Sequence, residues 1–343
     1  MTSSEPLLTI AVPTYNRAGY LDLCLENLIA QAREHGDTVE VVVSDNASED
    51  GTQSVVGRYR SAWPALRAVR NKENIGSDRN IAQCFALARG RYALIFGDDD
   101  VLLPGALGRI LAVLKNGEHG VVFLKPYGYD DDFIREHPRT LRTGYTMYTD
   151  SERFLRKVHV YCTFISANII NKALAADIDL DRAIGTNLVQ VRLVYRAALR
   201  AASNVYFRDY MVAAKRNNSG GYDYLRVFVA NFNDALEAAS ADGLSSTVRR
   251  AIQRTVIFRH LPYYVMRMRR SDPEFDGDEA HRMLLRHYPG SLLYWLCLYP
   301  ILKAPLILAL PWTWSLIFAS RAAAGEMGRM FAFVTSRLRG KAA

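Results

Sequence analysis

The segment RYALIFGDDD spans residues 91–100 and decides the fold that we expect for this chain. Residues 92–96 are continuously apolar, as in a strand that is buried on both faces of a sheet. The aspartates Asp98, Asp99 and Asp100 follow directly after Gly97. In open sheets of parallel strands, ligands bind beyond the carboxyl ends of the strands. The segment therefore predicts a polar site at the end of a buried strand.

The three carboxylates have the chemistry of a metal site. Adjacent carboxylates repel one another unless a cation or hydrogen-bond donors offset their charge. Oxygen ligands suit a hard ion such as Mg²⁺ or Mn²⁺, and such an ion also bridges phosphate oxygens. Asp98, Asp99 and Asp100 are therefore candidate metal ligands. A solvated acidic turn is the alternative, and the position after a buried strand favours the metal.

Strands and helices alternate on the N-terminal side of this segment. Continuous apolar runs predict strands, and apolar residues at helical spacing predict helices. We expect strands at 7–13, 39–45, 66–71 and 91–97, and helices at 19–35, 54–63 and 78–88. This alternation predicts an α/β fold, in which a doubly wound, mostly parallel sheet is covered by helices on both faces.

The rest of the chain has an irregular part and then a helical part. We expect strands at 121–129 and 205–214 and a helix at 187–199, while 161–171 fits either a strand or a helix end. The pattern is helical from residue 226 onward. We therefore expect a first domain of residues 1–225 and a C-terminal helical region of residues 226–343.

Two further polar segments follow predicted strands and contain groups suited to a nucleotide. VPTYNR (12–17) offers Tyr15 for stacking on a flat base and Arg17 for a phosphate. NIGSDRN (74–80) contains Arg79, a candidate partner of a pyrophosphate. For VPTYNR the alternative is an ordinary turn between a strand and a helix.

The segment SDNASEDGT (44–52) follows the second predicted strand. Asp45 and Asn46 are placed to accept hydrogen bonds from a base. Turn chemistry is the alternative, because Asn, Asp, Ser and Gly all favour turns and helix caps.

Together these segments resemble glycosyltransferase family 2, whose members have the GT-A fold. The resemblance lies in their order, each at a strand end or in the loop after it: VPTYNR, SDNAS, NIGSDRN and then GDDD, which resembles a D-x-D motif. It covers about residues 6–125 closely and extends loosely to about residue 220. Residues 74–107 look similar to the abequosyltransferase-like members that build bacterial surface polysaccharides.

The resemblance implies a nucleotide-sugar donor, a divalent metal (Mg²⁺ or Mn²⁺) and transfer to a saccharide acceptor. Asp98 and Asp100 would form the D-x-D pair. Lys215 and Arg216 lie in a polar loop that would hold a diphosphate of the donor or of a lipid acceptor, and a plain surface loop is the alternative. The full set of expected donor-binding residues is Pro13, Thr14, Tyr15, Arg17, Asp45, Asn46, Arg79, Asp98, Lys215 and Arg216.

The catalytic base is where the sequence departs from the family pattern. Inverting members use a carboxylate, usually in an acidic motif that opens a helix after the acceptor loop. In the matching segment 177–193, the helix start carries residues 185–187, GTN, without an acid. Asp179 and Asp181 are the next candidates, and a surface or capping role is the alternative. The departure leaves open a retaining outcome, or a catalytically degenerate scaffold component of a polysaccharide assembly complex.

The C-terminal region predicts contact with a membrane. Residues 292–320 contain one charge, Lys303, and are long enough to cross a bilayer. Three prolines interrupt the run, and its Trp and Tyr side chains suit a membrane interface. We expect broken helices that lie in the cytoplasmic leaflet, with a single transmembrane pass as the alternative.

The formal net charge of +8 indicates an acidic partner. Residues 249–270 contain seven arginines and no acid, and we expect them to face anionic headgroups. Nucleic acid would explain the charge but not the apolar run, so we expect no nucleic-acid partner. Because the N-terminus lacks the pattern of a signal peptide, we expect the catalytic part on the cytoplasmic face of the plasma membrane, with a lipid-linked, polyprenyl-diphosphate saccharide as acceptor.

Overall fold

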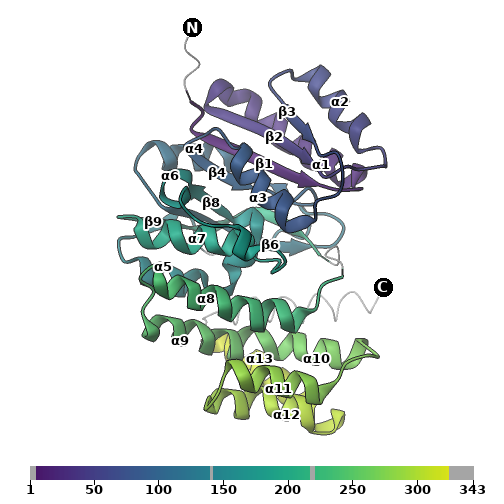
Figure 1. The fold of residues 1–343 in the computed structure, drawn as a ribbon, viewed down its shortest axis with the longest axis vertical. Helices are drawn as coiled ribbons and strands as arrows, with labels where there is room; N and C mark the ends of the chain where they lie inside the picture. The colour runs from purple at the N-terminus through teal and green to yellow at the C-terminus, as the bar shows by residue number, and fades with distance from the viewer. Residues whose placement is uncertain (1–4, 140–141, 217–220, 324–343) are drawn as a thin grey trace. The chain divides into compact units, whose positions relative to one another are not determined.

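The computed structural model of the protein describes residues 5–139, 142–216 and 221–323 (Figure 1). The chain divides into two compact units. The first contains residues 1–223 and 234–245, and the second contains residues 224–233 and 246–343. Residues 234–245 thus fold with the first unit, although they lie within the C-terminal region that the sequence predicts from residue 226 onward.

A nine-stranded sheet forms the centre of the first unit within the described residues. Its order is β3-β2-β1-β4-β8-β6-β9-β5, and β7 pairs with β9. The strands are β1 (Leu8–Thr14), β2 (Val39–Asp45), β3 (Arg67–Arg70), β4 (Tyr92–Ile95), β5 (Val101–Leu102), β6 (Val121–Tyr129), β7 (Tyr145–Tyr148), β8 (Asn168–Asn171) and β9 (Asn204–Lys215).

The sheet has a parallel half and a mixed half. Strands β3, β2, β1 and β4 are parallel, as the alternation of strands and helices predicts. In the other half, β8 runs antiparallel to both β4 and β6, and β9 is parallel to β6 but antiparallel to β5 and β7. The α/β fold is confirmed, and the sheet is mixed rather than mostly parallel. Strand β8 comes directly after two 3-10 turns, at His159–Thr163 and Ile165–Ala167, and runs opposite to both of its neighbours in the sheet.

Helices cover both faces of this sheet (Figure 1). Alternate residues of β1, such as Leu8 and Ile10, pack in one core with Leu25 of α1 and Ile110 of α4. Helices α3 and α7 contact β1, β4, β6 and β8 from the other side. The helices of this unit are α1 (Ala18–Ala32), α2 (Thr52–Ala62), α3 (Ser77–Leu87), α4 (Ala106–Lys115), α5 (Ser151–Val158), α6 (Lys172–Ala175) and α7 (Val189–Arg200).

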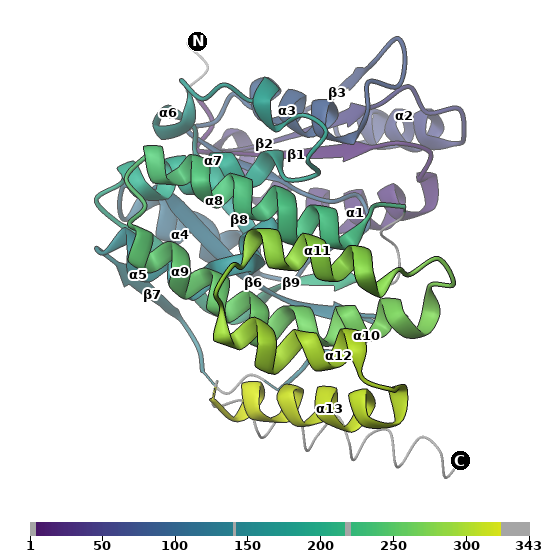
Figure 2. The ribbon, with the colours of Figure 1, turned by 60° about the horizontal axis from the view of Figure 1, so that its bottom comes forward.

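The second unit is helical throughout its described regular structure. Its elements are η5 (Arg226–Asn231), the first residues of α8 (Phe232–Ala241), α9 (Ser246–Thr255), η6 (Val256–His260), α10 (Leu261–Ser271), α11 (Gly277–His287), η7 (Tyr294–Leu298), α12 (Tyr299–Lys303) and α13 (Leu306–Ala323). Helix α13 contacts α10 and α12, and it lies beside them in Figure 2. The break between α12 and α13 falls at Ala304, whose backbone is extended because Pro305 disfavours helix at the residue before it.

Candidate functional site

The carboxyl ends of the parallel strands bring the polar segments together. Thr14 ends β1 and pairs in register with Asp45, which ends β2. Strand β4 lies on the other side of β1, and the aspartates follow it after Phe96 and Gly97. Segments that are about 30 and 80 residues apart therefore share one edge of the sheet.

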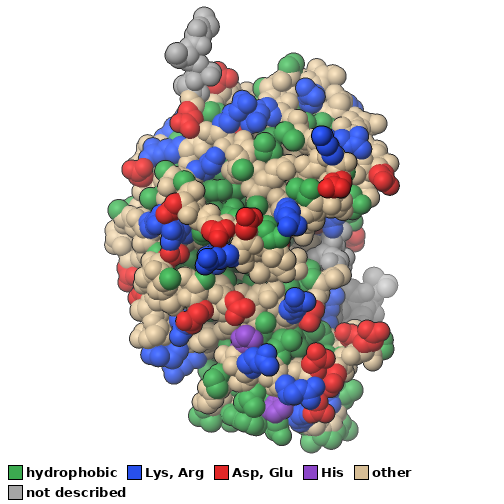
Figure 3. Space-filling model, viewed as in Figure 1, with side chains coloured by type: hydrophobic (Ala, Val, Ile, Leu, Met, Phe, Trp, Pro, Cys, Tyr) green, Lys and Arg blue, Asp and Glu red, His purple; other side chains and the backbone are tan. Residues whose placement is uncertain are grey.

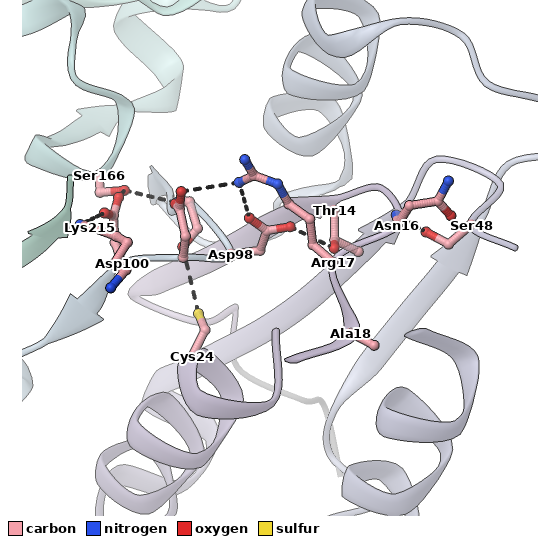
Figure 4. A network of polar contacts seen from close by, with 12 residues as sticks. Thr14, Asn16, Arg17, Ala18, Cys24, Ser48, Asp98, Asp100, Ser166 and Lys215 are labelled. Carbon is pink, nitrogen blue, oxygen red and sulfur yellow. Dashed lines mark hydrogen bonds and ion pairs between the residues drawn. The ribbon is translucent and has the colours of Figure 1, made fainter. Parts of the chain in front are cut away.

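Asp98 is buried and holds the loop after β1. Its Oδ2 accepts a hydrogen bond from the Thr14 hydroxyl at 2.7 Å. Its Oδ1 accepts from the Arg17 guanidinium at 3.1 Å, and the same guanidinium nitrogen reaches Asp99 Oδ2 at 3.1 Å. Figure 4 shows the contacts of Arg17 and Thr14 with the Asp98 carboxylate. One arginine thus bridges two of the three aspartates.

Asp100 is buried and is held by two segments that lie far from it along the chain. Its Oδ2 accepts from the Ser166 hydroxyl, and its Oδ1 accepts from the backbone N–H of Lys215 at 3.3 Å (Figure 4). The Ser166 hydroxyl in turn accepts from the backbone N–H of Gly97 at 2.8 Å. A Cβ at Gly97 would lie 2.8 Å from Asp100 Oδ2 and 3.0 Å from an Asp99 oxygen, so this turn requires glycine.

Two of the three carboxylates at this site have raised pKa values. Burial raises the pKa of Asp98 to about 6, against the opposing hydrogen bond from Thr14 and the charge of Arg17. Burial, together with repulsion from Asp99, raises the pKa of Asp100 well above its ordinary value. Raised carboxyl pKa values mean that the site favours bound protons or another positive charge. Arg17 neutralises only part of the charge of the three carboxylates.

The chemistry of this donor set fits a divalent cation that is shared with a ligand's phosphates. Mg²⁺ in proteins is often held by only one or two carboxylates, with phosphate oxygens and waters completing its shell. Within residues 5–139, 142–216 and 221–323, no group of three His, Cys, Asp or Glu side chains is arranged to hold an ion by itself. The ligand set of Asp98, Asp99 and Asp100 therefore stays a prediction, and a cage built from protein groups alone has no support here.

Asp45 and Asn46 form hydrogen bonds within the protein. Asp45 accepts from the backbone N–H of Ser48 at 3.0 Å and from the Gln53 amide, and its Oδ2 lies 3.6 Å from Arg70 Nε. These bonds orient a carboxylate that is only 1% exposed.

Asn46 links two loops of the site. Its Oδ1 accepts from the Asn71 amide and from the backbone N–H of Ile75, both at 3.0 Å. Its Nδ2 donates to Asn74 at 2.7 Å. This amide therefore fixes the loop that precedes Arg79 and α3.

Several predicted donor-binding groups lie at the surface. The Tyr15 side chain is 42% exposed, Pro13 is partly buried, and Arg79 projects from the first turn of α3 into solvent. The backbone at Asn16 is left-handed, with φ of 52°, and it is held by Ser48, whose hydroxyl accepts from the Asn16 N–H at 2.8 Å. Non-glycine residues with positive φ are uncommon, and such strain concentrates at binding sites.

Lys215 and Arg216 lie beside the loop after β6. The Lys215 ammonium donates to the backbone carbonyl of Asp130 and lies over the Tyr129 ring, 5.2 Å from its centroid. Arg216 pairs with the Asp130 carboxylate at 2.8 Å. The backbone N–H of Lys215 donates to Asp100, and neither cationic side chain makes a hydrogen bond or ion pair with any of the three aspartates after β4 within the described part of the chain. These two cations therefore border the site from β9.

The candidate bases Asp179 and Asp181 are exposed in the loop before α7. Asp179 accepts from the backbone N–H of Asp181 at 3.1 Å and pairs with Arg182 at 3.2 Å. Among the described residues, neither carboxylate makes a hydrogen bond to the aspartates after β4. A capping role is thus visible for Asp179, and a catalytic role stays a prediction.

The structure adds two residues that the sequence patterns did not single out. Ser166 fixes Asp100, and Asp78 of α3 fixes the start of α7. The buried Asp78 carboxylate accepts from the backbone N–H of Asn187 at 2.9 Å, and the nearby backbone N–H groups of Gly185 and Thr186 lower its pKa against the effect of burial. An acid therefore does contact residues 185–187, but it comes from NIGSDRN, 109 residues earlier.

Comparison with known proteins agrees with this architecture. Residues 9–178 match the family described as Glycosyl transferase family 2. The chain is 32% identical over 199 residues to abequosyltransferase RfbV of Salmonella typhimurium, covering 54% of this chain and 59% of that protein. It is 36% identical over 121 residues to the uncharacterized protein Rv1520 of Mycobacterium tuberculosis, covering 35% of this chain and 34% of that protein. The chain thus spans about a third to three fifths of these relatives.

Among solved structures, the fold matches S. aureus TarS, residues 1–349, with a TM-score of 0.60 and 17% identity over 92% of this chain and 91% of that one. The same protein in complex with UDP-GlcNAc gives a TM-score of 0.59 at 16% identity, covering 92% of both chains. At this identity the likeness concerns the fold.

Proposed function

Because residues 9–178 match glycosyltransferase family 2, we propose that this chain transfers a sugar from a nucleotide-sugar donor to a saccharide acceptor during synthesis of a bacterial surface polysaccharide. The observation that carries the proposal is the pair of buried carboxylates, Asp98 and Asp100, at the carboxyl end of a parallel strand. Such a sheet edge is where α/β enzymes bind nucleotides.

The donor would lie across the ends of β1, β2 and β4. Tyr15 is exposed and suited to stack on the base, beside the buried carboxylate of Asp45. Arg79, which makes no hydrogen bond or ion pair with any other described residue, would contact the diphosphate, as would Lys215 and Arg216.

Asp98 and Asp100 would hold Mg²⁺ or Mn²⁺ together with the donor phosphates. The ion supplies positive charge against the charge that develops on the leaving nucleoside diphosphate. Arg17 contributes a further positive charge on the same side, since it contacts both Asp98 and Asp99. Ser166 keeps Asp100 oriented, so the carboxylate does not have to reorganise when the donor binds.

The acceptor hydroxyl would attack the anomeric carbon of the donor sugar while a carboxylate takes its proton. Asp181 and Asp179 are our candidates for this base, because both lie in the loop that Asp78 anchors at residues 185–187. A base must come within hydrogen-bond reach of the acceptor, so movement of this loop would be part of the mechanism. We propose inversion at the anomeric carbon on the family resemblance.

The second unit would hold the enzyme at the cytoplasmic face of the membrane, where a lipid-linked saccharide is available as acceptor. Helix α13 is long and apolar enough to cross a bilayer by length and composition. Its large side chains Ile307, Leu308, Trp314 and Phe318 are 46–80% exposed. Figure 3 shows hydrophobic side chains gathered at the surface over the C-terminal helices. Trp and Tyr at such a surface favour an interfacial position.

The test is calorimetric binding of a panel of nucleoside diphosphates, including UDP, GDP and CDP, with Mn²⁺ and with a chelator. We expect one nucleotide to bind only with metal, and Asp100→Asn to weaken that binding at least about ten-fold, since it removes charge without changing shape. Asp37→Asn is the matched control, because Asp37 is exposed and precedes β2, at the end of that strand opposite Asp45. Equal loss in both variants, or metal-independent binding, would contradict the assignment.

A second candidate function is a catalytically degenerate scaffold component. It is favoured by one observation, the absence of an acid among residues 185–187 at the start of α7. Sugar transfer to a lipid-linked acceptor separates the two: a scaffold binds the nucleotide without turnover, whereas the enzyme loses turnover in Asp181→Asn or Asp179→Asn while it keeps nucleotide binding.

A further inference from the structure

A small cavity lies between α10 and α13 in the second unit. Its volume is about 120 Å³, below the roughly 300 Å³ at which pockets for whole small-molecule ligands begin. It is therefore too small for a nucleotide sugar and large enough for a compact group such as a phosphate. Its lining combines charge with apolar surface: Tyr263, Met266, Arg267, Arg270, Ser271, Leu310, Thr313, Trp314 and Ile317.

Two arginines form the charged part of the lining. Arg267 and Arg270 are exposed on α10, one turn apart, so both guanidinium groups border the same cavity. Neither makes an ion pair or a hydrogen bond with another residue of the described chain. By contrast, Arg269 on the same helix donates to the carbonyl of Ile301. Two adjacent guanidinium groups suit the oxygens of a phosphate group.

The apolar part of the lining belongs to α13, a helix whose buried face is mostly small or polar and whose exposed face is apolar. The buried residues of α13 are Ala309, Thr313, Leu316 and Ser320, which are mostly small or polar. Large apolar side chains occupy its exposed face, and residues 306–320 contain no charge. In water this arrangement is unfavourable, because apolar surface stays hydrated. Contact with hydrocarbon would therefore stabilise the exposed face of α13, beside the two arginines.

A second hollow extends the apolar surface on the other flank of α13. It measures about 290 Å³ and is lined by Pro300, Ala304, Leu308, Ala309 and Trp312. No charged side chain lines it. The two hollows thus offer a site for a phosphate and a site for hydrocarbon on one helix.

We propose that the cavity between α10 and α13 binds the phosphate group of a membrane lipid, with Arg267 and Arg270 as its ligands and α13 against the lipid chains. The inference deepens the membrane role given above and rests on that part of the proposed function. It does not depend on sugar transfer.

The test uses the full chain and short-chain lipids below their micelle concentration, so that no membrane surface is present. We expect dihexanoyl phosphatidylglycerol to bind more tightly than dihexanoyl phosphatidylcholine, as measured by calorimetry. In Arg267→Gln/Arg270→Gln, affinity for phosphatidylglycerol should fall on the order of ten-fold or more, because charge-assisted hydrogen bonds are lost. Arg282→Gln/Arg286→Gln on α11 is the matched control, with the same loss of charge at exposed positions.

Two further probes identify the source of the phosphate. Farnesyl diphosphate that competes with phosphatidylglycerol and depends on the same arginines would assign the site to a polyprenyl diphosphate. Inorganic phosphate that binds as tightly as either lipid would overturn the proposal, and so would equal losses in both double variants. Nucleotide binding is measured in parallel, so that a failure of the donor site is distinguished from a failure of the lipid site.

Discussion

Gly97 has the least freedom of any residue at the candidate site. The turn after β4 has to bring three carboxylates close together, and a Cβ would lie 2.8 Å from Asp100 Oδ2 and 3.0 Å from Asp99 Oδ1. The contact with Asp100 is shorter than real Cβ atoms show and the contact with Asp99 is tight, and the hydrogen bond from Ser166 opposes a shift of the Asp100 carboxylate. The absence of a side chain at Gly97 therefore lets the carboxylates of Asp99 and Asp100 lie close to this turn.

We expect Gly97→Ala to weaken metal-dependent nucleotide binding at least about ten-fold and to lower the free energy of unfolding by about 1–3 kcal/mol, the usual range for overpacking. Gly57→Ala is its control. Gly57 lies inside α2 with no atom within 4 Å of an added Cβ, so the substitution should stabilise the fold by about 0.5–1 kcal/mol and leave binding unchanged. Normal binding by Gly97→Ala would show that the carboxylates need not be held in this arrangement.

At this scale, the sequence identifies residues that follow strands but not their partners. Asp98, Asp45 and Thr14 were predictable, because parallel strands end at a common edge. Ser166 was not, since it reaches Asp100 from 66 residues away through two short turns with no repeating pattern. The role of Lys215 toward a diphosphate stays a prediction; the sequence does not indicate that its backbone N–H contacts Asp100 or that its ammonium contacts the Asp130 carbonyl.

Among the elements, the start of α7 depends on α3. The Asp78 carboxylate accepts from the backbone N–H of Asn187 through Oδ2, and its other oxygen, Oδ1, has no hydrogen-bond partner among the described residues. Burial raises the pKa of Asp78, and the backbone N–H groups of residues 185–187 oppose this rise, Asn187 first among them. The loop that carries Asp179 and Asp181 is thus anchored at its C-terminal end by this carboxylate.

We expect Asp78→Ala to free this loop, and tryptic cleavage after Arg182 should become several times faster than in the wild type. The free energy of unfolding should fall by about 1–3 kcal/mol, because buried N–H groups lose their acceptor. Asp78→Asn keeps one acceptor oxygen and should lie between the two proteins in both measurements. If Asp78→Ala leaves cleavage unchanged, residues 185–187 hold their own conformation.

In the second unit, η6 ends in a histidine that is surrounded by aromatic rings. The ring of His260 lies 4.9 Å from Tyr264 and 5.4 Å from Phe228, and His260 Nε2 is 2.5 Å from the Tyr224 hydroxyl. Burial lowers the pKa of His260 to about 4. The neutral ring is therefore the form that this cluster accommodates.

This shift predicts that acid destabilises the protein. Between pH 6.5 and pH 4 the unfolded chain binds a proton at His260 that the folded chain does not, so stability is complete above pH 6.5 and falls as the pH drops toward 4. The loss should be roughly 2 kcal/mol after allowance for partial exposure. His260→Phe keeps the ring and should flatten the dependence of the thermal midpoint on pH in this window. An unchanged slope would place the acid sensitivity elsewhere.

The strand pattern explains why the elements were largely predictable. The predicted strands at 7–13, 39–45, 66–71, 91–97 and 121–129 are all confirmed. A continuous apolar run such as 92–96 leaves no helical period, whereas 66–71 contains two arginines and forms only the four-residue strand β3 at the end of the sheet. The sequence leaves strand and helix end open for residues 161–171, and the structure contains both kinds of backbone: two 3-10 turns and then β8. The antiparallel pairing of β8 depends on partners far along the chain, which a local pattern does not specify.

At the scale of the whole molecule, the face of α13 that packs against the protein is not the face that carries its large apolar side chains. In a water-soluble protein, the apolar face of a helix is the face that packs. Here Leu316 packs at 8% exposure, while Ile307 and Phe318 are 80% and 46% exposed. Substitutions on the two faces should therefore affect different properties of the protein.

We expect Ile307→Asn/Phe318→Ser to reduce sedimentation with vesicles of phosphatidylglycerol and phosphatidylethanolamine at least about ten-fold, since each buried apolar side chain contributes about 1.5–3 kcal/mol. The thermal midpoint should stay unchanged or rise, because these side chains make few contacts inside the protein. Leu316→Ala should do the reverse, with about 2 kcal/mol or more lost from the free energy of unfolding and normal vesicle binding in the folded protein. If Ile307→Asn/Phe318→Ser lowers the midpoint as much as Leu316→Ala does, the exposed face is covered by protein in solution, and the membrane is not its partner.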